Sequence, residues 1–158
     1  MLHGVCWLLL ENKSGVRSYL GIDIVTPPFG ILNEAAYLAL KCGINFKFIK
    51  ANDMDIDIAP VDMLFIDSLH TYCHLTYELE KFSPKARKFI AMHDTSAPWG
   101  TEDDDAYRGD YSEYPAWIDR TKRGLWVAVE DFLVRHPEWK LKERRLNCHG
   151  LTILERSL

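Results

Sequence analysis

The sequence predicts an α/β protein whose sheet is mostly parallel, with an antiparallel pair of strands at one edge. Two apolar runs, at 61–66 and 88–92, pass abruptly into polar groups, which is typical of buried parallel strands at their carboxyl ends. Predicted strands alternate with predicted helices along the chain, as in sheets covered by helices on both faces. The two final strands are separated by Asn147-Cys148-His149-Gly150, and an antiparallel hairpin is the simplest arrangement for them.

The elements follow in a regular order. A strand at 18–25 stops at a Thr-Pro-Pro sequence, since proline cannot continue a ladder of hydrogen bonds. A helix is expected where apolar residues recur at helical spacing before Gly43, which favours its end. We expect strands at 18–25, 44–51, 61–66, 88–92, 139–146 and 151–156, and helices at 30–42, 71–82 and 124–136. Residues 54–59 are ambiguous and are interpreted as a short link, and residues 4–10 fit a buried strand or a buried helix.

Composition narrows the class of protein. The chain has 158 residues, enough for one domain over 1–158 with a real core, and 47% of them are hydrophobic. A net charge of -4 gives no indication of a nucleic-acid surface. No apolar run approaches the ~20 residues of a membrane span, and the amino terminus lacks the flanks of a signal peptide. Four scattered cysteines without a CxxC pair indicate reduced thiols in a cytoplasmic protein.

The segment 97–122 shows little periodicity and is rich in acidic and aromatic residues. A loop of this length inside a compact domain is usually functional or disordered. Its tyrosines and tryptophans need something to pack against, so we expect it to be ordered and to cover the acceptor of a reaction. Within helix 71–82, Leu75, Leu79 and Phe82 share one face, whereas Glu78, Glu80 and Lys81 are expected to face water. His74 is also expected to be a solvated helix residue. The acidic run at 102–105 is expected to be a solvated loop rather than a second metal site.

Polar side chains follow two strands of the predicted sheet. Asp67 and His70 come after 61–66, and His93 and Asp94 come after 88–92. Since ligands bind at the carboxyl ends of strands in open α/β sheets, these four side chains are expected at one edge. Carboxylate and imidazole together suit a divalent cation, for which Asp67, His93 and Asp94 are the predicted ligands. His70 is the candidate general base, because histidine titrates near neutrality.

Each assignment has a plainer alternative. His93 or Asp94 could cap the loop after its strand, and His70 could cap the following helix. Cys73 and His74 lie near His70 on one helix, but a zinc site there is the less favoured interpretation. Upstream, Asp23 closes a strand, where an acidic side chain can accept hydrogen bonds from ribose hydroxyls or simply occupy a surface turn. A side chain at Asn52-Asp53, after the next strand, could reach an adenine amino group.

These segments resemble the class I S-adenosylmethionine-dependent methyltransferases. The resemblance covers about residues 16–96 and is found in the stretches SYLGIDI, VDMLFIDSLHTY and KFIAMHDT. The branch with cephalosporin hydroxylase-like and macrocin O-methyltransferase-like proteins is the most similar, since it shows an IDxxHxY strand end and an HDT or EDT strand end. The resemblance implies that Asp23 holds the cofactor ribose, that Asp53 lies near the adenine, and that Asp67 and Ser68 also contribute to the cofactor site.

The resemblance also implies a metal, with one reservation of chemistry. Asp67, His93 and Asp94 would face a magnesium ion, but His93 stands where many relatives have glutamate, and imidazole suits softer metals than Mg²⁺. The family's glycine-rich turn and the strand before it are not found ahead of Ser18. Residues 3–10 look like the helix that follows that turn, so the chain is expected either to be an amino-terminally truncated form or to use residues 4–10 as the missing strand.

Three functions are compatible with these residues. The leading hypothesis is transfer of the sulfonium methyl of S-adenosylmethionine to an oxygen of a small molecule or sugar, with a metal acidifying the acceptor hydroxyl. A metal-dependent hydrolase using the same aspartates and histidines is the second. The third is an inactive methyltransferase-like interaction domain, motivated by the missing glycine turn. A small-molecule acceptor and a possible homo-oligomer are the expected partners, with neither nucleic acid nor membrane.

Overall fold

A computed structural model describes residues 15–106 and 111–157. The expectations for residues 3–10 fall outside the described residues, as does Cys6. The chain folds as two compact units, residues 1–57 and 58–158, and each unit is described by itself below. The prediction of one domain over 1–158 stays a prediction.

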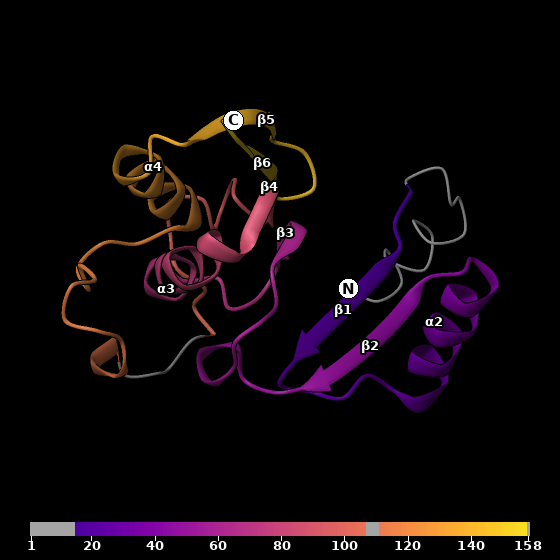
Figure 1. Ribbon diagram of the computed structural model, residues 1–158. Coiled ribbons are helices and arrows are strands. Elements are labelled where there is room, and N and C mark those ends of the chain that lie inside the picture. Colours follow the sequence, from indigo (N-terminus) through magenta and orange to yellow (C-terminus); the bar gives the residue numbers. More distant parts are fainter. Residues whose placement is uncertain (1–14, 107–110, 158) are drawn as a thin grey trace. The chain divides into compact units, whose positions relative to one another are not determined.

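The described part of the N-terminal unit, from residue 15 onward, contains a β-α-β motif. Strand β1 (Ser18–Asp23) and strand β2 (Asn45–Lys50) pair in parallel, and helix α2 (Phe29–Lys41) connects them (Figure 1). Pro28 precedes α2 and Gly43, at φ +67°, follows it, so both ends use the residues that interrupt a helix. Ala39 and Ile44 form its core, with Tyr19 and Phe46 packed against them. A short 3₁₀ turn (Asp53–Asp55) then opens the segment expected to be a link.

The C-terminal unit contains a four-stranded sheet in the order β3-β4-β6-β5. Strand β3 (Val61–Ile66) is parallel to β4 (Ala86–His93), which is antiparallel to β6 (Leu151–Arg156). Strand β5 (Trp139–Arg145) completes the predicted hairpin with β6. The α/β class, the parallel pairs and the antiparallel hairpin are therefore confirmed, and each strand boundary lies within two residues of the expected one.

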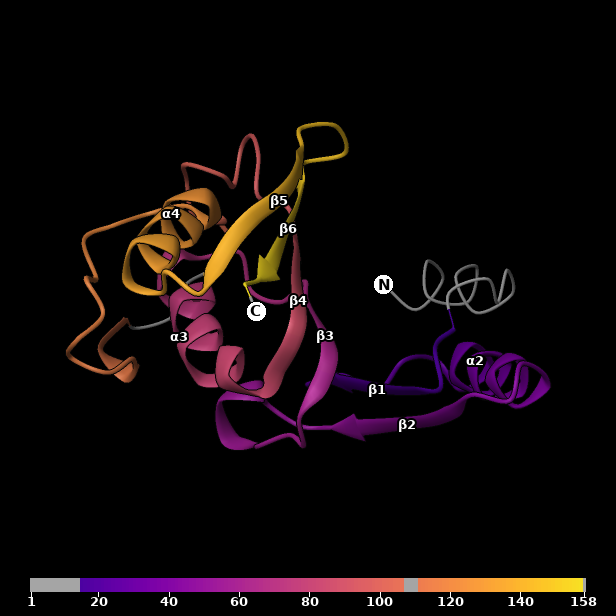
Figure 2. The ribbon, with the colours of Figure 1, turned by 45° about the horizontal axis from the view of Figure 1, so that its top comes forward.

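Two helices pack on one face of this sheet (Figures 1 and 2). Helix α3 (Tyr72–Phe82) connects β3 to β4, and helix α4 (Leu125–Arg135) precedes β5. The Thr71 hydroxyl accepts the His74 N–H and caps α3. The core between helices and sheet is made of fully buried side chains, including Leu79, Ile90, Val129, Phe132 and Leu154. Helices on both faces of one sheet would involve both units, and this expectation stays a prediction.

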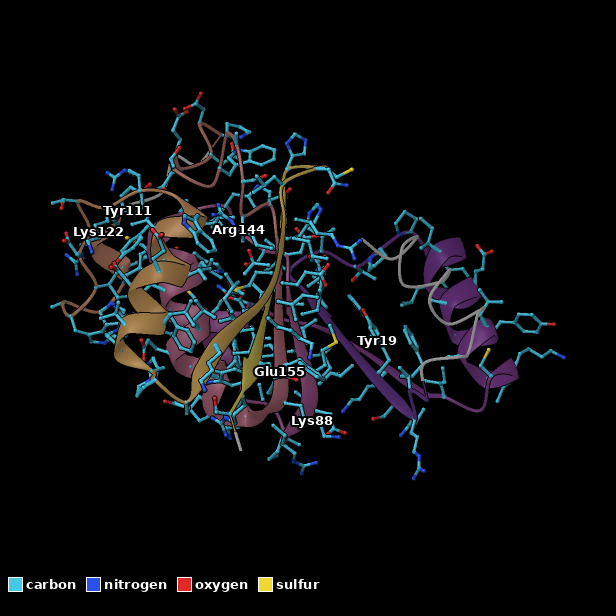
Figure 3. The ribbon with its side chains drawn as sticks, turned by 90° about the horizontal axis from the view of Figure 1, so that it is seen from above. Tyr19, Lys88, Tyr111, Lys122, Arg144 and Glu155 are labelled. Atoms are coloured by element: carbon cyan, nitrogen blue, oxygen red, sulfur yellow. The ribbon has the colours of Figure 1, made fainter. Side chains whose placement is uncertain are left out.

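The segment between β4 and α4 is ordered where it is described, as its aromatic content predicted. Its later part, from residue 111 onward, runs along α3 and α4 on the side away from the sheet (Figures 1 and 2). Tyr114 and Ile118 are buried, with exposed fractions of 2% and 4%, so this part of the segment belongs to the core. Tyr111 and Lys122 both lie on the side of the C-terminal unit where its helices are found (Figure 3). Across the described residues, no helix has both the length and the apolar character needed to cross a membrane.

Candidate functional site

The parallel pairing of β3 and β4 brings their carboxyl ends to one edge of the sheet. The two strands are in register from Met63–Phe89 to Ile66–Met92. Asp67 and His93, the next residue on each strand, therefore come side by side, and Asp94 follows. The expectation that the two polar strand ends lie together is met within the C-terminal unit.

His70 lies between the carboxylates of this edge. Its Nε2 atom is 2.9 Å from Asp94 Oδ2 and 3.7 Å from Asp67 Oδ1. Asp67, His70 and Asp94 each offer one ligand atom, and these atoms lie within 4.8 Å of one another, close enough for a single metal ion. His93 is also near, with Nδ1 3.1 Å from Asp94 Oδ1 and 3.7 Å from Asp67 Oδ1.

The predicted ligand set and the observed cluster overlap in two residues. Asp67 and Asp94 belong to both, whereas the structure groups them with His70 rather than with His93. The side chain of His70 is 19% exposed and that of His93 is 34% exposed. The metal itself, and His93 as its ligand, stay predictions.

The burial of the Asp94 carboxylate is consistent with a ligand bound at this edge of the sheet. The exposed fraction of Asp94 is 6%, and within the described part of the chain its buried Oδ1 atom forms no hydrogen bond, although His93 Nδ1 lies 3.1 Å from it. A buried carboxylate oxygen in this state loses its hydration without compensation, unless a cation or a donor binds it. The donor set of two carboxylates and one imidazole suits Mn²⁺, Fe²⁺ or Zn²⁺ better than Mg²⁺.

The charge of the edge is set by its carboxylates. The pKa of His70 is raised above its usual value, chiefly by the Asp67 carboxylate, with Asp94 and Asp104 adding to the effect and partial burial opposing it. The carboxylates therefore stabilise the imidazolium form of His70 more than solvent stabilises it in a free histidine. Binding a cation through Nε2 would displace that proton, because metal ligands must be deprotonated.

The backbone of the C-terminal hairpin holds the loop after β4. Asp94 has φ 59°, and its N–H donates to Gly150 O at 2.9 Å. The N–H of Ser96 donates to His149 O at 2.6 Å. Gly150 has φ 102°, and a Cβ atom there would lie 2.6 Å from Ser96 N, so no larger residue fits. The hairpin turn is thus part of the site's support.

Trp99 forms a side of the cluster. Its ring centroid lies 4.7 Å from that of His70 and 4.9 Å from that of His149. Of the segment expected to cover an acceptor, the beginning lies at the cluster, whereas the part around Tyr114 is buried against α3. Covering of an acceptor by this segment stays a prediction.

Two residues of α3 that were expected to face water are buried instead. His74 is 6% exposed and Glu78 is 5% exposed. The Ser68 hydroxyl donates to Glu78 Oε2 at 2.6 Å, and His74 Nδ1 lies 3.1 Å from the Tyr114 hydroxyl. The prediction was wrong because helical periodicity does not show that a loop covers a second face of α3. The proximity of Ser68 and Glu78 had no signal in the sequence.

The acidic run at 102–105 is also more structured than expected. Asp103 Oδ1 accepts the N–H groups of Tyr72 and Gly124, both at 2.8 Å, and Asp103 Oδ2 accepts the Tyr111 hydroxyl at 2.7 Å. The Asp103 side chain is 7% exposed. It therefore fixes the loop to the start of both helices, so the expectation of a wholly solvated run is wrong at this residue.

The other predicted cofactor residues lie in the N-terminal unit. Asp23 ends β1, and its Oδ1 atom accepts the Val25 N–H at 2.9 Å, which is the surface-turn role left open by the sequence. Asn52 accepts the Met54 N–H and caps the turn that begins at Asp53. Contacts of Asp23, Asp53, Asp67 and Ser68 with a cofactor stay predictions.

The three cysteines that the structure describes, Cys42, Cys73 and Cys148, are free, as expected. Burial raises the pKa of Cys73 to about 11, so this thiol is not suited to act as a nucleophile or as a readily ionised metal ligand.

Comparisons with known proteins support the fold. No protein-family model matches the sequence, and no curated protein matches it. Among solved structures, the chain is similar to an O-methyltransferase family 2 protein from Planctomyces limnophilus DSM 3776 in complex with apigenin, with a TM-score of 0.55 and 13% identity over 94% of this chain and 46% of the other. It is similar to OxaC with a TM-score of 0.50 and 11% identity, over 99% of this chain and 39% of the other.

A third structure, an S-adenosylmethionine-dependent methyltransferase from Clostridium acetobutylicum ATCC 824, has a TM-score of 0.47 and 12% identity over 99% of this chain and 91% of the other, which is too low to support an argument. The chain spans less than half the length of the first two structures. Together with the strand pairing, the likeness shows the Rossmann-like α/β fold of class I methyltransferases. At these identities it shows the fold alone.

Proposed function

We propose that the chain acts as an S-adenosylmethionine-dependent methyltransferase that methylates an oxygen of a small molecule or sugar with the help of a divalent metal. The observation that carries the proposal is the cluster of Asp67, His70 and Asp94 at the carboxyl ends of two parallel strands. The fold is compatible with it, since one similar structure is that of an O-methyltransferase family 2 protein in complex with apigenin. Sites in such sheets lie at this edge.

In this proposal Asp67, His70 and Asp94 hold the metal, which when bound lowers the pKa of a coordinated acceptor hydroxyl. His70 is assigned to the metal as a ligand because its Nε2 atom lies 2.9 Å from Asp94 Oδ2 and 3.7 Å from Asp67 Oδ1. The role of general base that the sequence predicted for His70 stays a prediction. Trp99 limits the access of water beside His70. Methyl transfer itself depends mainly on alignment of the acceptor oxygen with the methyl group, so positioning is the principal task of these side chains.

Cofactor binding is assigned to the residues that the sequence predicted. We propose that the Asp23 carboxylate accepts hydrogen bonds from the ribose, that Asp53 contributes at the adenine, and that Asp67 and Ser68 also contribute to cofactor binding. Possible self-association and a cytoplasmic location belong to the same proposal.

Calorimetry tests the assignment directly. The full chain is titrated with S-adenosylmethionine, with S-adenosylhomocysteine, and separately with Mn²⁺ and Co²⁺. Binding of both cofactor forms and of one metal ion per chain is expected, with weaker cofactor binding in Asp23→Asn. Absence of cofactor binding with metal binding intact would argue for the hydrolase alternative, which ester and phosphoester substrates then examine. Absence of both would leave the inactive interaction domain.

A further inference from the structure

One more acidic residue faces the cluster from the segment after β4. The backbone N–H of Asp104 donates to the carbonyl oxygen of His70 at 2.8 Å, so the two residues are fixed next to each other. The carboxylate of Asp104 is oriented by the Ala106 N–H, which donates to Oδ1 at 2.8 Å. The other oxygen, Oδ2, lies 4.0 Å from His70 Nδ1.

The Nδ1 atom of His70 is without a partner. It is buried, and across residues 15–106 and 111–157 no hydrogen bond to it is formed. Leaving a buried hydrogen-bond donor without an acceptor is destabilising, so a nearby acceptor that binds this donor stabilises the structure. On the opposite side of the ring, Nε2 already contacts Asp94, and the Trp99 ring lies beside the imidazole. Nδ1 is therefore the ring nitrogen of His70 that still lacks a hydrogen bond, whereas Nε2 and the ring face are in contact with Asp94 and Trp99.

The separation of 4.0 Å is about 1 Å longer than an N–H···O hydrogen bond. A small rotation of the Asp104 side chain or a single bridging water closes a gap of this size. The neighbouring residue keeps Asp104 within that range, because the buried Asp103 carboxylate ties the loop to Tyr72 and Gly124. The backbone at Asp104 is thus held in place by the contacts of Asp103 and by its own hydrogen bond to the His70 carbonyl oxygen.

We propose that Asp104 is a positioning residue whose carboxylate accepts the Nδ1–H of His70 and thereby holds the imidazole with Nε2 toward Asp67 and Asp94. The metal part of this inference rests on the proposed function, whereas the hydrogen bond itself does not. Histidines that bind metals generally donate their second ring N–H to a carboxylate, carbonyl or water, and loss of that partner weakens metal binding about 10–100-fold.

The chain offers an isosteric variant and a matched control. Asp104→Asn keeps an oxygen for the Ala106 N–H but replaces Oδ2 by an amide N–H₂, which cannot accept from Nδ1. Asp105→Asn makes the same change of charge one residue away, at an exposed side chain. Any difference between the two variants therefore reports the contact with His70 and not the net charge of the loop. Circular dichroism verifies that both variants fold.

Two measurements on the full chain complete the test. In the metal-free protein at mildly acidic pH, where the ring carries both protons, ¹⁵N-edited NMR of His70 is expected to show a protected Nδ1–H in the wild type and in Asp105→Asn. In Asp104→Asn this proton is expected to exchange rapidly. In a Co²⁺ titration followed by visible absorption, Asp104→Asn is expected to bind about 10–100-fold more weakly, with Asp105→Asn close to wild type.

The outcomes separate the inference from the proposed function. Equal Nδ1–H protection in wild type and Asp104→Asn overturns the inference, even if Co²⁺ binds the wild type. Absence of Co²⁺ binding by the wild type contradicts the metal site, while a loss of protection confined to Asp104→Asn still supports the hydrogen bond. Equal loss of Nδ1–H protection in Asp104→Asn and Asp105→Asn also overturns the inference, since it assigns the effect to the charge of the loop alone.

Discussion

The two units of the chain differ in how much apolar surface each buries by itself. In the C-terminal unit, Ile90, Phe132 and Leu154 are fully buried between the sheet and two helices. In the N-terminal unit, the completely buried side chains of α2 are alanines, whereas Phe29 and Leu40 are 80% and 76% exposed. A two-stranded sheet with one helix has little room for a core.

This difference coincides with a difference in the candidate site. The C-terminal unit by itself brings together Asp67, His70 and Asp94, which a large core can hold in place. The N-terminal unit supplies Asp23, an exposed side chain engaged in a local turn. A precise constellation of side chains needs rigid support, and here that support is found where the apolar core is large.

The largest expected effect is on the core itself. Phe132→Ala should lower the free energy of unfolding of the C-terminal unit by about 3–5 kcal/mol, because it leaves a cavity in a fully buried region. Ile44→Ala in the N-terminal unit should cost about 2 kcal/mol, since half-buried Tyr19 and Phe46 can close over the space. Native-state hydrogen exchange of amides in β4 and β2 measures both. Equal costs would contradict the contrast between the two cores.

Two glycines with positive φ test the same contrast in the backbone. A Cβ atom on Gly124 would lie 2.5 Å from Gly100 O and Thr101 Cα, whereas one on Gly43 meets nothing within 4 Å. Gly124→Ala should therefore destabilise by about 3 kcal/mol, and Gly43→Ala by about 1 kcal/mol from its backbone conformation alone. Urea denaturation followed by circular dichroism compares them. A larger effect at Gly43 would be the opposite of this expectation.

The affinity for a metal ion should depend on side chains of the C-terminal unit and not on Asp23 of the N-terminal unit. Asp94→Asn removes the charge of a buried carboxylate that we propose binds the metal, and it is expected to weaken Co²⁺ binding at least about 100-fold, since even the loss of an outer partner weakens it about 10–100-fold. Asp23→Asn should leave Co²⁺ binding unchanged, because its carboxylate belongs to the turn after β1. Visible absorption titrations provide the two constants. If both variants lost affinity to a similar degree, the cluster would not be the metal site.

The smallest effect concerns alkaline pH. Tyr72 donates to Asp131 Oδ2 at 2.7 Å, and burial followed by this hydrogen bond raises the Tyr72 pKa from 10.0 to about 12. The folded state holds the phenolic proton of Tyr72 more tightly than the unfolded state does. The contribution of this group to the free energy of unfolding is therefore fully present below pH 10 and is lost as the pH rises toward 12. Tyr72→Phe should weaken this decrease and remove about 1 kcal/mol at neutral pH.

Tyr37→Phe is the matched control for that change, since Tyr37 is 57% exposed on α2. Its urea midpoints should follow the wild type at every pH. An unchanged pH dependence in Tyr72→Phe would mean that the Asp131 contact does not hold the phenolic proton.

Most of the fold could be predicted because its signals are local. The run at 61–66, the prolines after β1 and the glycine after α2 each indicate an element from its own residues. Likewise, the parallel order of β3 and β4 was enough to bring Asp67 and Asp94 to one edge, since the carboxyl ends of parallel neighbours always meet. Periodicity and turn chemistry therefore suffice for element types.

The parts that were missed depend on contacts between distant segments. The composition of the Asp67, His70 and Asp94 cluster could be predicted only by knowing that His70 turns back toward Asp94, which no spacing rule gives. Burial of His74 and Glu78 depends on Tyr114 and Ser68, which lie on other elements. Asp103 and Asp104 are neighbours in a run of four acidic residues, yet one caps helices and the other faces His70. Charge patterning cannot separate such roles.

The hairpin turn at Gly150 has a practical consequence for protein engineering. Loop tips between strands usually accept insertions, affinity tags or the new termini of a circular permutation. Here the carbonyl groups of His149 and Gly150 bind the amides of Ser96 and Asp94, and the glycine leaves no room for a side chain. A fluorophore or tag placed at this turn would therefore disturb Asp94, and labels belong instead on exposed residues remote from it, such as Val134 on α4.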